Sequence, residues 1–413
     1  MDGCSAMKSK LILLVSFGLY FFAGCTGGVV STTASNSTQD TSPSKTTVSK
    51  ESSESSSPTV ENFGDADWPL FRGNSTSQGV AASGLPKQMD IVWKHEIPNG
   101  AFEGTPIIIG RNDKQVFVGD ADGALLAINL ETGEVLWEFQ SEIGYVTAPA
   151  FKDNLIYIGD LDGKFYCINA KGEKVWEFEA EDSIDSSANF YKDLVLFGSR
   201  DARLYALNAK TGESVWQLET ADQVRCSITV VDGRAFVAGC DGALHIINLD
   251  DGKEIDSVLI ESPTGVTPAA QGDLIFVGTE QSGFYAIDWK KAELKWTFND
   301  KEGPISTRSS PSVTEDHVVF GARNRKVYSI NPISGKENWS AELKANIDSS
   351  PVIVGNRVFV GSTDGRFYEL ELKTGKIVWQ KQFDGGFIGS PAVGFGKLVI
   401  ATDRGVVYCL GSG

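Results

Sequence analysis

The segment LVLFGSRDARLYALNAKTGESVWQLE, residues 194–219, contains three short apolar runs separated by two polar turns. β-Branched, aromatic and aliphatic residues favour strands, whereas Gly and Asp tolerate the backbone angles of tight turns. The first run ends at Gly198, the second covers residues 204–207, and the third carries Trp216 four residues after Gly212. This segment therefore predicts consecutive antiparallel strands joined by tight turns.

The same pattern recurs along most of the chain. Its apolar strands end at Gly119, Gly159, Gly198, Gly239, Gly278, Gly321, Gly361 and Ala401. Successive positions lie 39 to 43 residues apart, which is the length of a four-stranded blade in a β-propeller. We therefore predict an all-β propeller.

A tryptophan marks the outer strand of nearly every repeat. These residues are Trp93, Trp137, Trp176, Trp216, Trp296, Trp339 and Trp379. A tryptophan on an outer strand buries a large apolar area against the next blade, so we assign these residues a blade-locking role. The fourth repeat has Asp256 at this position, and we expect that blade to be the weak joint of the ring.

The two ends of the repeat array complement each other. Residues 91–94 form an outer strand with no preceding inner strands, and the last repeat stops before its tryptophan strand. Joining them completes an eighth blade and removes an exposed sheet edge. The predicted fold is an eight-bladed propeller over residues 91–413, closed by N- and C-terminal strands in one blade.

The N-terminus predicts export and lipidation. Lys8 and Lys10 precede a 13-residue uncharged run that ends at Ala23, followed by Gly24 and Cys25. This run is too short to span a bilayer as a helix and is typical of a signal peptide. Residues 22–25 resemble a bacterial lipobox, which implies lipid attachment at Cys25. Ordinary signal cleavage and an uncleaved anchor are the alternatives, and translation can start at Met1 or Met7.

Two segments separate this signal from the ring. Of the 30 residues from 31 to 60, 18 are Ser or Thr and none is aromatic. Such a composition cannot bury enough apolar surface to offset chain entropy, so we expect a disordered tether. The predicted organisation is a signal peptide (1–24), the tether (25–62), a leader segment that packs on the propeller (63–90) and the propeller (91–413).

The repeat of strand, Asp-Gly turn, Tyr-Ala strand, Thr-Gly turn and Trp resembles the pyrroloquinoline-quinone (PQQ) repeat over residues 91–410. Residues 67–73 and 84–86 also resemble a leader that precedes some exported propellers of this type. The resemblance implies the eight-bladed, quinoprotein-like fold. That family includes PQQ dehydrogenases and also non-enzymatic, BamB-like lipoproteins, to which this chain is closest in character.

The sequence argues against several kinds of chemistry. The 54 acidic and 37 basic residues give a net charge of −17, which disfavours nucleic-acid binding. The resemblance implies that PQQ enzymes carry a vicinal disulfide and long insertions, and this chain has no adjacent cysteines. Calcium is conceivable at Asp120–Gly123 and Asp160–Gly163, but both motifs read better as tight turns. We expect no catalytic residues, no metal and no cofactor.

One set of residues is predicted to ring the funnel mouth. Each inner strand begins near a Ser-Pro or equivalent pair, and the residue two positions earlier should face the channel. These residues are Glu103, Val146, Asp185, Arg225, Gly265, Arg308, Asp348 and Ile388. We interpret the charged members, Glu103, Asp185, Arg225, Arg308 and Asp348, as a candidate site for a polar peptide or small ligand. Salt bridges between blades are the alternative role for these charges.

Cys226 and Cys240 flank a hairpin whose turn is Asp232-Gly233. A two-residue turn pairs Cys226 with Gly239 and puts Cys240 out of register, whereas a three-residue turn sets the two cysteines opposite each other. The Asp-Gly pair favours the shorter turn and free thiols. An oxidising compartment favours a disulfide instead.

These observations predict a monomeric envelope scaffold, tethered through Cys25 and facing the periplasm, that binds a protein or peptide through a propeller face. A quinoprotein-like enzyme or cofactor binder is one alternative. A propeller that binds carbohydrate or another small ligand is the other. The sequence leaves open whether the inner or the outer membrane carries the lipid.

Overall fold

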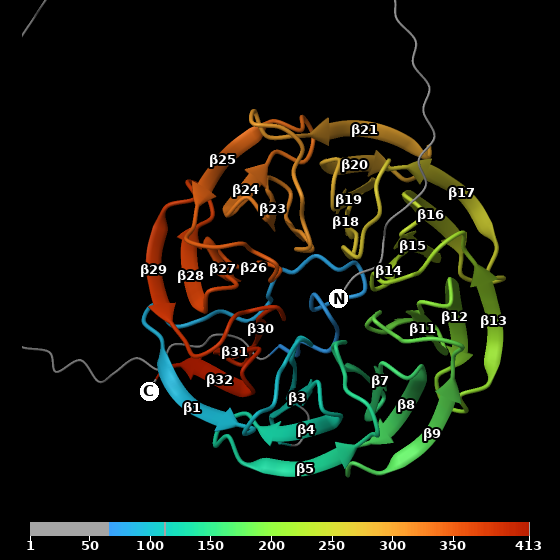
Figure 1. The fold of residues 1–413 in the computed structure, drawn as a ribbon, viewed down its shortest axis with the longest axis vertical. Helices are drawn as coiled ribbons and strands as arrows, with labels where there is room; N and C mark the ends of the chain where they lie inside the picture. Colours follow the sequence, from blue (N-terminus) through green and yellow to red (C-terminus); the bar gives the residue numbers. More distant parts are fainter. Residues whose placement is uncertain (1–65, 111–112, 413) are drawn as a thin grey trace, which may run out of the picture. The chain divides into compact units, whose positions relative to one another are not determined.

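The computed structural model describes residues 66–110 and 113–412, which form eight four-stranded antiparallel sheets arranged around a central channel (Figure 1). Blades 1 to 7 each take four consecutive strands, from β2–β5 in blade 1 to β26–β29 in blade 7. Blade 8 combines β30, β31 and β32 with β1. The predicted eight-bladed propeller is confirmed.

The strands fall into four concentric sets. The innermost strands, in blade order, are β2 (Ile107–Ile109), β6 (Ala150–Lys152), β10 (Asn189–Tyr191), β14 (Thr229–Val231), β18 (Ala269–Gln271), β22 (Ser312–Val313), β26 (Val352–Val354) and β30 (Ala392–Gly394). The second strands are β3 (Gln115–Gly119), β7 (Leu155–Gly159), β11 (Leu194–Gly198), β15 (Arg234–Ala238), β19 (Leu274–Gly278), β23 (Val318–Gly321), β27 (Arg357–Gly361) and β31 (Lys397–Ala401). The third strands are β4 (Ala124–Asn129), β8 (Lys164–Asn169), β12 (Arg203–Asn208), β16 (Ala243–Asn248), β20 (Phe284–Asp288), β24 (Lys326–Ile330), β28 (Arg366–Glu371) and β32 (Val406–Gly411). The outer strands are β5 (Val135–Gln140), β9 (Lys174–Glu179), β13 (Ser214–Glu219), β17 (Glu254–Leu259), β21 (Glu293–Phe298), β25 (Glu337–Glu342), β29 (Ile377–Gln382) and β1 (Asp90–Glu96).

The ring closes through β1, as the sequence predicts. β1 pairs antiparallel with β32, and Trp93 lies opposite Cys409. This pairing joins the two ends of the described chain in one sheet (Figure 1). Because β1 satisfies the outer edge of β32, the ring leaves no unpaired third strand there.

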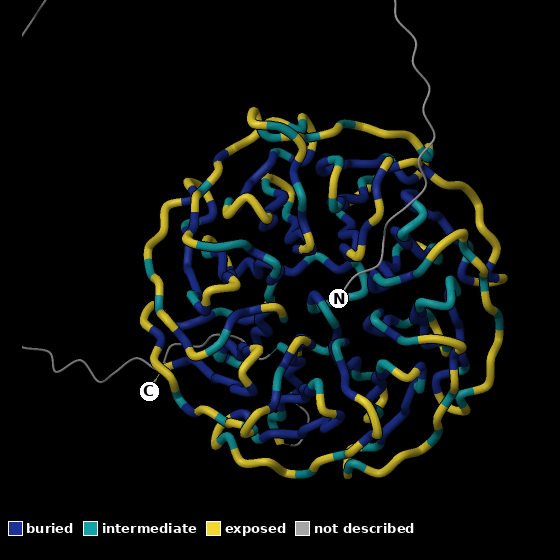
Figure 2. Tube along the Cα trace, in the orientation of Figure 1, coloured by how far each residue is buried: buried dark blue, intermediate teal, exposed yellow. Residues whose placement is uncertain are grey.

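Burial follows strand position within each blade. The second and third strands are almost entirely buried, whereas the outer strands alternate between exposed and half-buried residues (Figure 2). The middle strands are covered on both faces by neighbouring blades, so they read as continuous apolar runs in the sequence. The propeller core therefore lies between the blades rather than within any single sheet.

The strand register corrects one position of the repeat. Ala238 pairs with Leu244 just as Gly198 pairs with Leu204, so Ala238, and not Gly239, ends the second strand of blade 4. Gly239 already belongs to the following turn, where its N–H donates to the Ala243 carbonyl. Because an alanine ends this strand and a glycine follows it, the sequence pattern places the strand end one residue too late.

Most of the predicted tryptophans lie against the turn glycine of the next blade. Trp137 packs on Gly172, whose φ of +83° and close approach leave no room for a side chain. The Trp137 Nε1–H also donates to the Ala170 carbonyl at 3.0 Å. The remaining pairs are Trp93 on Gly133, Trp176 on Gly212, Trp216 on Gly252, Trp296 on Gly335 and Trp339 on Gly375. Trp379 instead joins the cluster containing Met89 and Trp93 at the closing blade.

The seam between blades 4 and 5, which the sequence predicts to be the weak joint of the ring, departs from this pattern. Asp256 is exposed on β17, but Trp289 of blade 5 fills the seam from the opposite side. The Trp289 ring meets Phe236 of blade 4 edge-to-face at 5.5 Å, and its Nε1–H donates to the Gly272 carbonyl at 3.1 Å. At this seam the tryptophan therefore comes from the later blade and packs on the earlier one, the reverse of the other seams.

A ring of hydroxyl groups joins the innermost strands. The backbone N–H of Ser187 donates to the Ser227 hydroxyl of the next blade at 3.0 Å, and the N–H of Ser227 donates to the Thr267 hydroxyl at 2.9 Å. The same bond recurs at the other blade junctions from blade 2 round to blade 1. Ala148 of blade 2 has no hydroxyl, so the bond is missing only between blades 1 and 2 in this series. The recurring Ser-Pro pair thus serves the fold.

The cysteine geometry follows the shorter turn. Val231 pairs with Arg234 across Asp232-Gly233, so the turn has two residues. Cys226 is buried, and its sulfur accepts the Ala238 N–H at 3.3 Å, whereas Cys240 is half-buried. Cys167, Cys226, Cys240 and Cys409 are all free thiols. The preference for free thiols is confirmed within the described residues.

Candidate functional site: the central funnel

Residues 68–79 of the leader lie in the channel (Figure 1). Their carbonyl groups accept hydrogen bonds from the N–H groups of the innermost strands. Trp68 bonds with Ile108 of blade 1, and Gly79 with Ile353 of blade 7. Between them, the carbonyls of Pro69, Ser75, Thr76 and Gln78 accept from Phe151, Val230, Ala270 and Val313. Each of these donors lies three residues after the position of its blade that forms the hydroxyl ring, which is Ala148 in blade 2. The mouth residues lie two positions before that position, so the leader follows the opposite end of the channel.

Arg72 fixes the leader at the centre. It is 1% exposed, and its guanidinium donates to the Ser312 hydroxyl at 2.7 Å and to the Pro311 carbonyl at 3.3 Å. Burial lowers the pKa of the Arg72 guanidinium to about 9. A buried arginine without hydrogen-bond partners would be costly, so these bonds favour one position for the leader, although the Arg72 Nε has no partner among the described residues.

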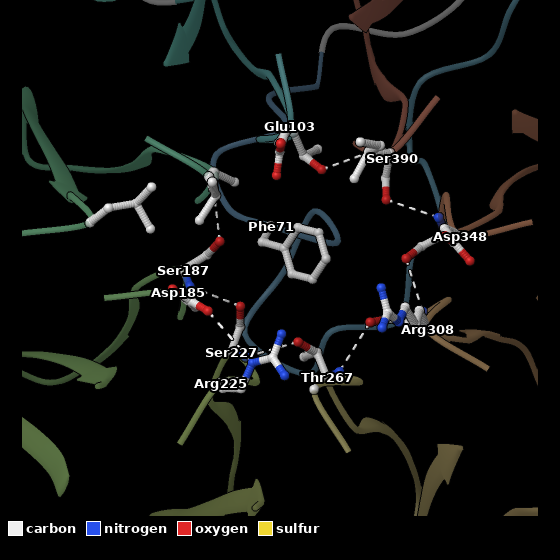
Figure 3. A pocket seen from close by; sticks show the side chains of 18 of the residues that line it. Phe71, Glu103, Asp185, Ser187, Arg225, Ser227, Thr267, Arg308, Asp348 and Ser390 are labelled. Atoms are coloured by element: carbon white, nitrogen blue, oxygen red, sulfur yellow. Dashed lines mark hydrogen bonds and ion pairs between the residues drawn. The ribbon is translucent and has the colours of Figure 1, made fainter. Parts of the chain in front are cut away.

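Phe71 forms the floor of the funnel. Its ring lies at the centre of a cavity of about 530 Å³ that opens at the mouth of the ring (Figure 3). All eight residues that the sequence places at the mouth line this cavity: Glu103, Val146, Asp185, Arg225, Gly265, Arg308, Asp348 and Ile388. The structure thus brings the candidate binding residues together around one aromatic floor.

The two aspartates are each held by an arginine that the sequence analysis missed. Asp185 accepts two hydrogen bonds from Arg200 of the same blade, at 2.6 and 2.8 Å. Asp348 accepts two from Arg323 of the preceding blade, at 3.0 and 3.1 Å. Both carboxylates thus form salt bridges, but with Arg200 and Arg323 and not with the other charges of the ring, and of these two pairs only Arg323–Asp348 joins different blades. Arg200 and Arg323 both stand two residues after a strand-ending glycine, so aligning that repeat position would have found them.

Arg225 and Arg308 are held much more loosely. Arg225 reaches Asp185 at 3.5 Å, and Arg308 reaches Glu280 at 3.7 Å, both beyond hydrogen-bonding geometry. Their side chains are 37% and 49% exposed. In Figure 3 they lie on one side of Phe71, and Glu103 lies on the other. The five charged residues at the mouth are thus two bound aspartates, two loosely held arginines and Glu103.

Apolar side chains line the sector next to Glu103. Val146 and Leu161 come from blade 2, Ala121 from blade 1 and Ile388 from blade 8. Ile388 is 41% exposed although it is apolar. Together with the Phe71 ring they give the cavity an apolar half facing the arginine half.

The donor groups present do not fit calcium. The Oδ1 atom of Asp120 accepts the N–H groups of Asp122 and Ala124, and Asp160 repeats this arrangement in blade 2. Both motifs are therefore closed turns whose carboxylates serve the backbone. Residues 66–110 and 113–412 contain no group of three His, Cys, Asp or Glu side chains placed to hold a metal ion. In the same part of the chain, no helix is long and apolar enough to cross a membrane.

Several solved structures share this fold. BamB from Moraxella catarrhalis is 18% identical and has a TM-score of 0.67, with 79% of this chain and 98% of that chain covered. The quinohemoprotein alcohol dehydrogenase from Comamonas testosteroni is 14% identical and has a TM-score of 0.71, with 84% and 81% covered. The computationally designed Ika8 protein is 18% identical and has a TM-score of 0.66, with 81% and 99% covered. At these identities, the likeness shows the fold alone.

A search of curated proteins found no match. The family comparison is more specific, because a family model described as outer membrane protein assembly factor BamB matches residues 86–227 and 200–411. These ranges span the whole ring of blades. The chain therefore belongs to this BamB family of PQQ-repeat propellers.

Proposed function

We propose that the protein is a non-enzymatic scaffold of the bacterial cell envelope that binds a protein or an extended peptide through its funnel face. The observation that carries the proposal is the cavity above Phe71, where charged and apolar side chains from different blades converge. Its walls come from loops before the inner strands and after the second strands, where residues vary without disturbing the blade core. The family description, an outer membrane protein assembly factor, supports a role in protein assembly.

The channel already binds one segment of its own polypeptide chain, which favours a peptide as the ligand class. The leader makes backbone hydrogen bonds to successive inner strands at the closed end. The open end presents charged side chains instead of free strand edges. A partner there would be recognised by its side chains and charged groups rather than by sheet extension.

A quinoprotein-like enzyme is the second candidate, favoured by the likeness to the alcohol dehydrogenase fold. The residues of this funnel argue against it. Asp185 and Asp348 are already bound by arginines, and Phe71 occupies the floor. A PQQ–calcium pair would require carboxylates free to bind the metal ion.

Filling the funnel tests the proposal. Gly265 has no positive φ, and a Cβ added there would meet only the Arg225 Cβ, at 3.7 Å. We expect Gly265→Trp to fold normally and to lose photo-crosslinks between the funnel face and envelope polypeptides. Val215→Trp, on an exposed outer strand, is the matched control and should keep them. Unchanged crosslinks in the Gly265 variant would refute binding at the funnel.

The membrane tether is proposed from the sequence, because Cys25 and the tether lie outside the described residues. We expect Cys25→Ser to release folded protein from the membrane fraction. Fractionation of cells that express the variant, with the propeller's melting temperature as the folding control, measures this. A variant that still sediments with membranes would show that another part of the chain holds it there.

A further inference from the structure

Arg225 and Arg308, on one side of the funnel, have N–H donors that are not used in short hydrogen bonds. A guanidinium offers five N–H donors in a planar fork that fits a carboxylate. Asp185 and Asp348 are already bound by Arg200 and Arg323, so the carboxylate contacts of Arg225 and Arg308 are long, at 3.5 and 3.7 Å. Arg225 also lies beside the Cys240 thiol, a weak acceptor. Both arginines are thus available to an incoming anion.

Blade 5 leaves space between these two arginines. Arg225 belongs to blade 4 and Arg308 to blade 6, and the intervening blade contributes Gly265 at the same ring position. The Thr267 hydroxyl lies beneath, where its oxygen accepts the Ser227 N–H at 2.9 Å. Its proton donates to no acceptor among the described residues, so the hydroxyl can donate to a ligand. A carboxylate placed above Gly265 would meet two guanidinium groups and one hydroxyl.

The opposite half of the funnel determines which chemical group can be attached to the carboxylate of the ligand. Blade 1, which faces blade 5 across the ring, presents Glu103, and this carboxylate repels a second anion. The flanking walls carry Val146, Leu161 and Ile388, and Phe71 forms the floor. A ligand with its carboxylate at the arginines would therefore place an apolar group over Phe71 and against these walls.

We propose that the funnel binds a peptide carboxylate that has an apolar side chain next to it, with the carboxylate between Arg225 and Arg308 and the apolar group on Phe71. This inference rests on the proposed function and names the chemistry of the partner. The same chemistry occurs at a C-terminus that ends in an apolar residue and at an internal acidic residue beside an apolar one. The test separates these two sources.

The primary probe is a dye-labelled hexapeptide with a free C-terminal Leu, titrated into the purified propeller by fluorescence anisotropy. We expect Arg225→Gln and Arg308→Gln each to weaken binding by about tenfold or more, because each removes charge-assisted hydrogen bonds. Arg404→Gln is the matched control, since Arg404 is 71% exposed, pairs with Asp384 and lies outside the cavity lining. Melting temperatures of all variants check folding.

Two further peptides identify the source of the carboxylate. Loss of binding on C-terminal amidation supports recognition of a chain end. Retained binding by an amidated peptide with an internal Glu-Leu pair, again lost in the two arginine variants, supports recognition of a side chain. If no carboxylate peptide binds, or if the arginine variants bind them equally well, the inference is wrong. In that case the proposed scaffold function still stands if Gly265→Trp abolishes the envelope crosslinks and Val215→Trp does not.

Discussion

The seams on the two sides of blade 4 lock the ring in opposite directions. Between blades 3 and 4, Trp216 of the earlier blade lies on Gly252 of the later one. Between blades 4 and 5, Trp289 of the later blade packs back on Phe236 of the earlier one. Trp216 is half-buried, whereas Trp289 is only 5% exposed. The seam between blades 4 and 5, which has no tryptophan on its outer strand, therefore contains the more deeply buried tryptophan of the two.

This difference shows how the turn residue and the tryptophan depend on each other. Gly252 has a φ of +70°, and a Cβ there would lie 2.5 Å from the Trp216 ring. The equivalent residue of blade 5 is Ala292, which also has a positive φ of 52° but has no tryptophan from β17 above it. An alanine is tolerated at this turn because Asp256 leaves its methyl group room. Having Asp256 in place of a tryptophan on the outer strand thus removes the requirement for glycine at the turn of the next blade.

The largest expected effect is at Trp289. Trp289→Ala removes a buried ring that also holds the Gly272 carbonyl, so we expect a loss of about 3–5 kcal/mol in the free energy of unfolding. Trp216→Ala should cost less because that side chain is half-buried and its Nε1–H has no partner among the described residues. Urea denaturation followed by tryptophan fluorescence and circular dichroism measures both.

Asp256→Ala is the control for this comparison. Asp256 is exposed, and its side chain caps only the neighbouring Ser257 N–H at 2.9 Å. We expect a change of less than about 0.5 kcal/mol. A large loss at Asp256 together with a small one at Trp289 would mean that the reversed lock does not hold the seam.

Gly252→Ala gives the next largest effect. The substitution forces an L-residue into the left-handed region, which costs about 1–2 kcal/mol, and also displaces the Trp216 ring. Gly272→Ala is the matched control, because Gly272 has a φ of +58° but nothing within 4 Å of its added Cβ. We expect Gly252→Ala to cost about 1–3 kcal/mol more than Gly272→Ala in the same denaturation experiment. Equal losses would show that the turn conformation alone, without the tryptophan contact, requires glycine.

The repeat made the ring predictable from the sequence, because each blade encodes the same turns and strands. The positions of Glu103, Asp185, Arg225, Arg308 and Asp348 at the mouth followed from the period alone. Each blade contributes one residue at this position of the repeat, and all of these residues lie at the same height in the channel. Aligning the repeats in the sequence was therefore sufficient to place them.

Features outside the repeat could not be found in this way. Phe71 and Arg72 belong to the leader, and nothing in their local sequence says that the segment enters the channel. The hydrogen bonds that place it join residues far apart in the sequence, such as Arg72 and Ser312, which are 240 positions apart. Trp289 was missed for another reason: it occupies a turn position where the other blades have Ala, Leu, Pro or Ser, and it packs on the blade before it.

Blade 4 also differs from its neighbours at His245, which occupies the position of Tyr205 in blade 3. The His245 Nε2 lies 2.8 Å from Asp241, and Nδ1 lies 2.8 Å from Glu254. Burial disfavours the imidazolium, but the hydrogen bonds and charges of the two carboxylates outweigh it and raise the pKa of His245 above 6.5. In blade 3, Tyr205 instead donates its hydroxyl proton to Asp201 at 2.5 Å, without a charge on the ring.

The smallest expected effect is therefore a pH dependence confined to blade 4. A raised folded-state pKa means that the imidazolium stabilises the fold fully below pH 6.5, the unfolded value, and that this contribution is lost as the pH rises through the folded value. His245→Tyr, with Asp241 as acceptor, should reproduce the blade 3 arrangement and flatten the stability curve over that range. Urea midpoints measured from pH 6 to pH 9 compare the two proteins. Burial alone would raise the pKa of Asp241, but its contact with His245 lowers it, so the stability that depends on this carboxylate and is lost on acidification should be smaller in the variant. An unchanged slope above pH 6.5 in His245→Tyr would show that the imidazole is neutral in the folded protein.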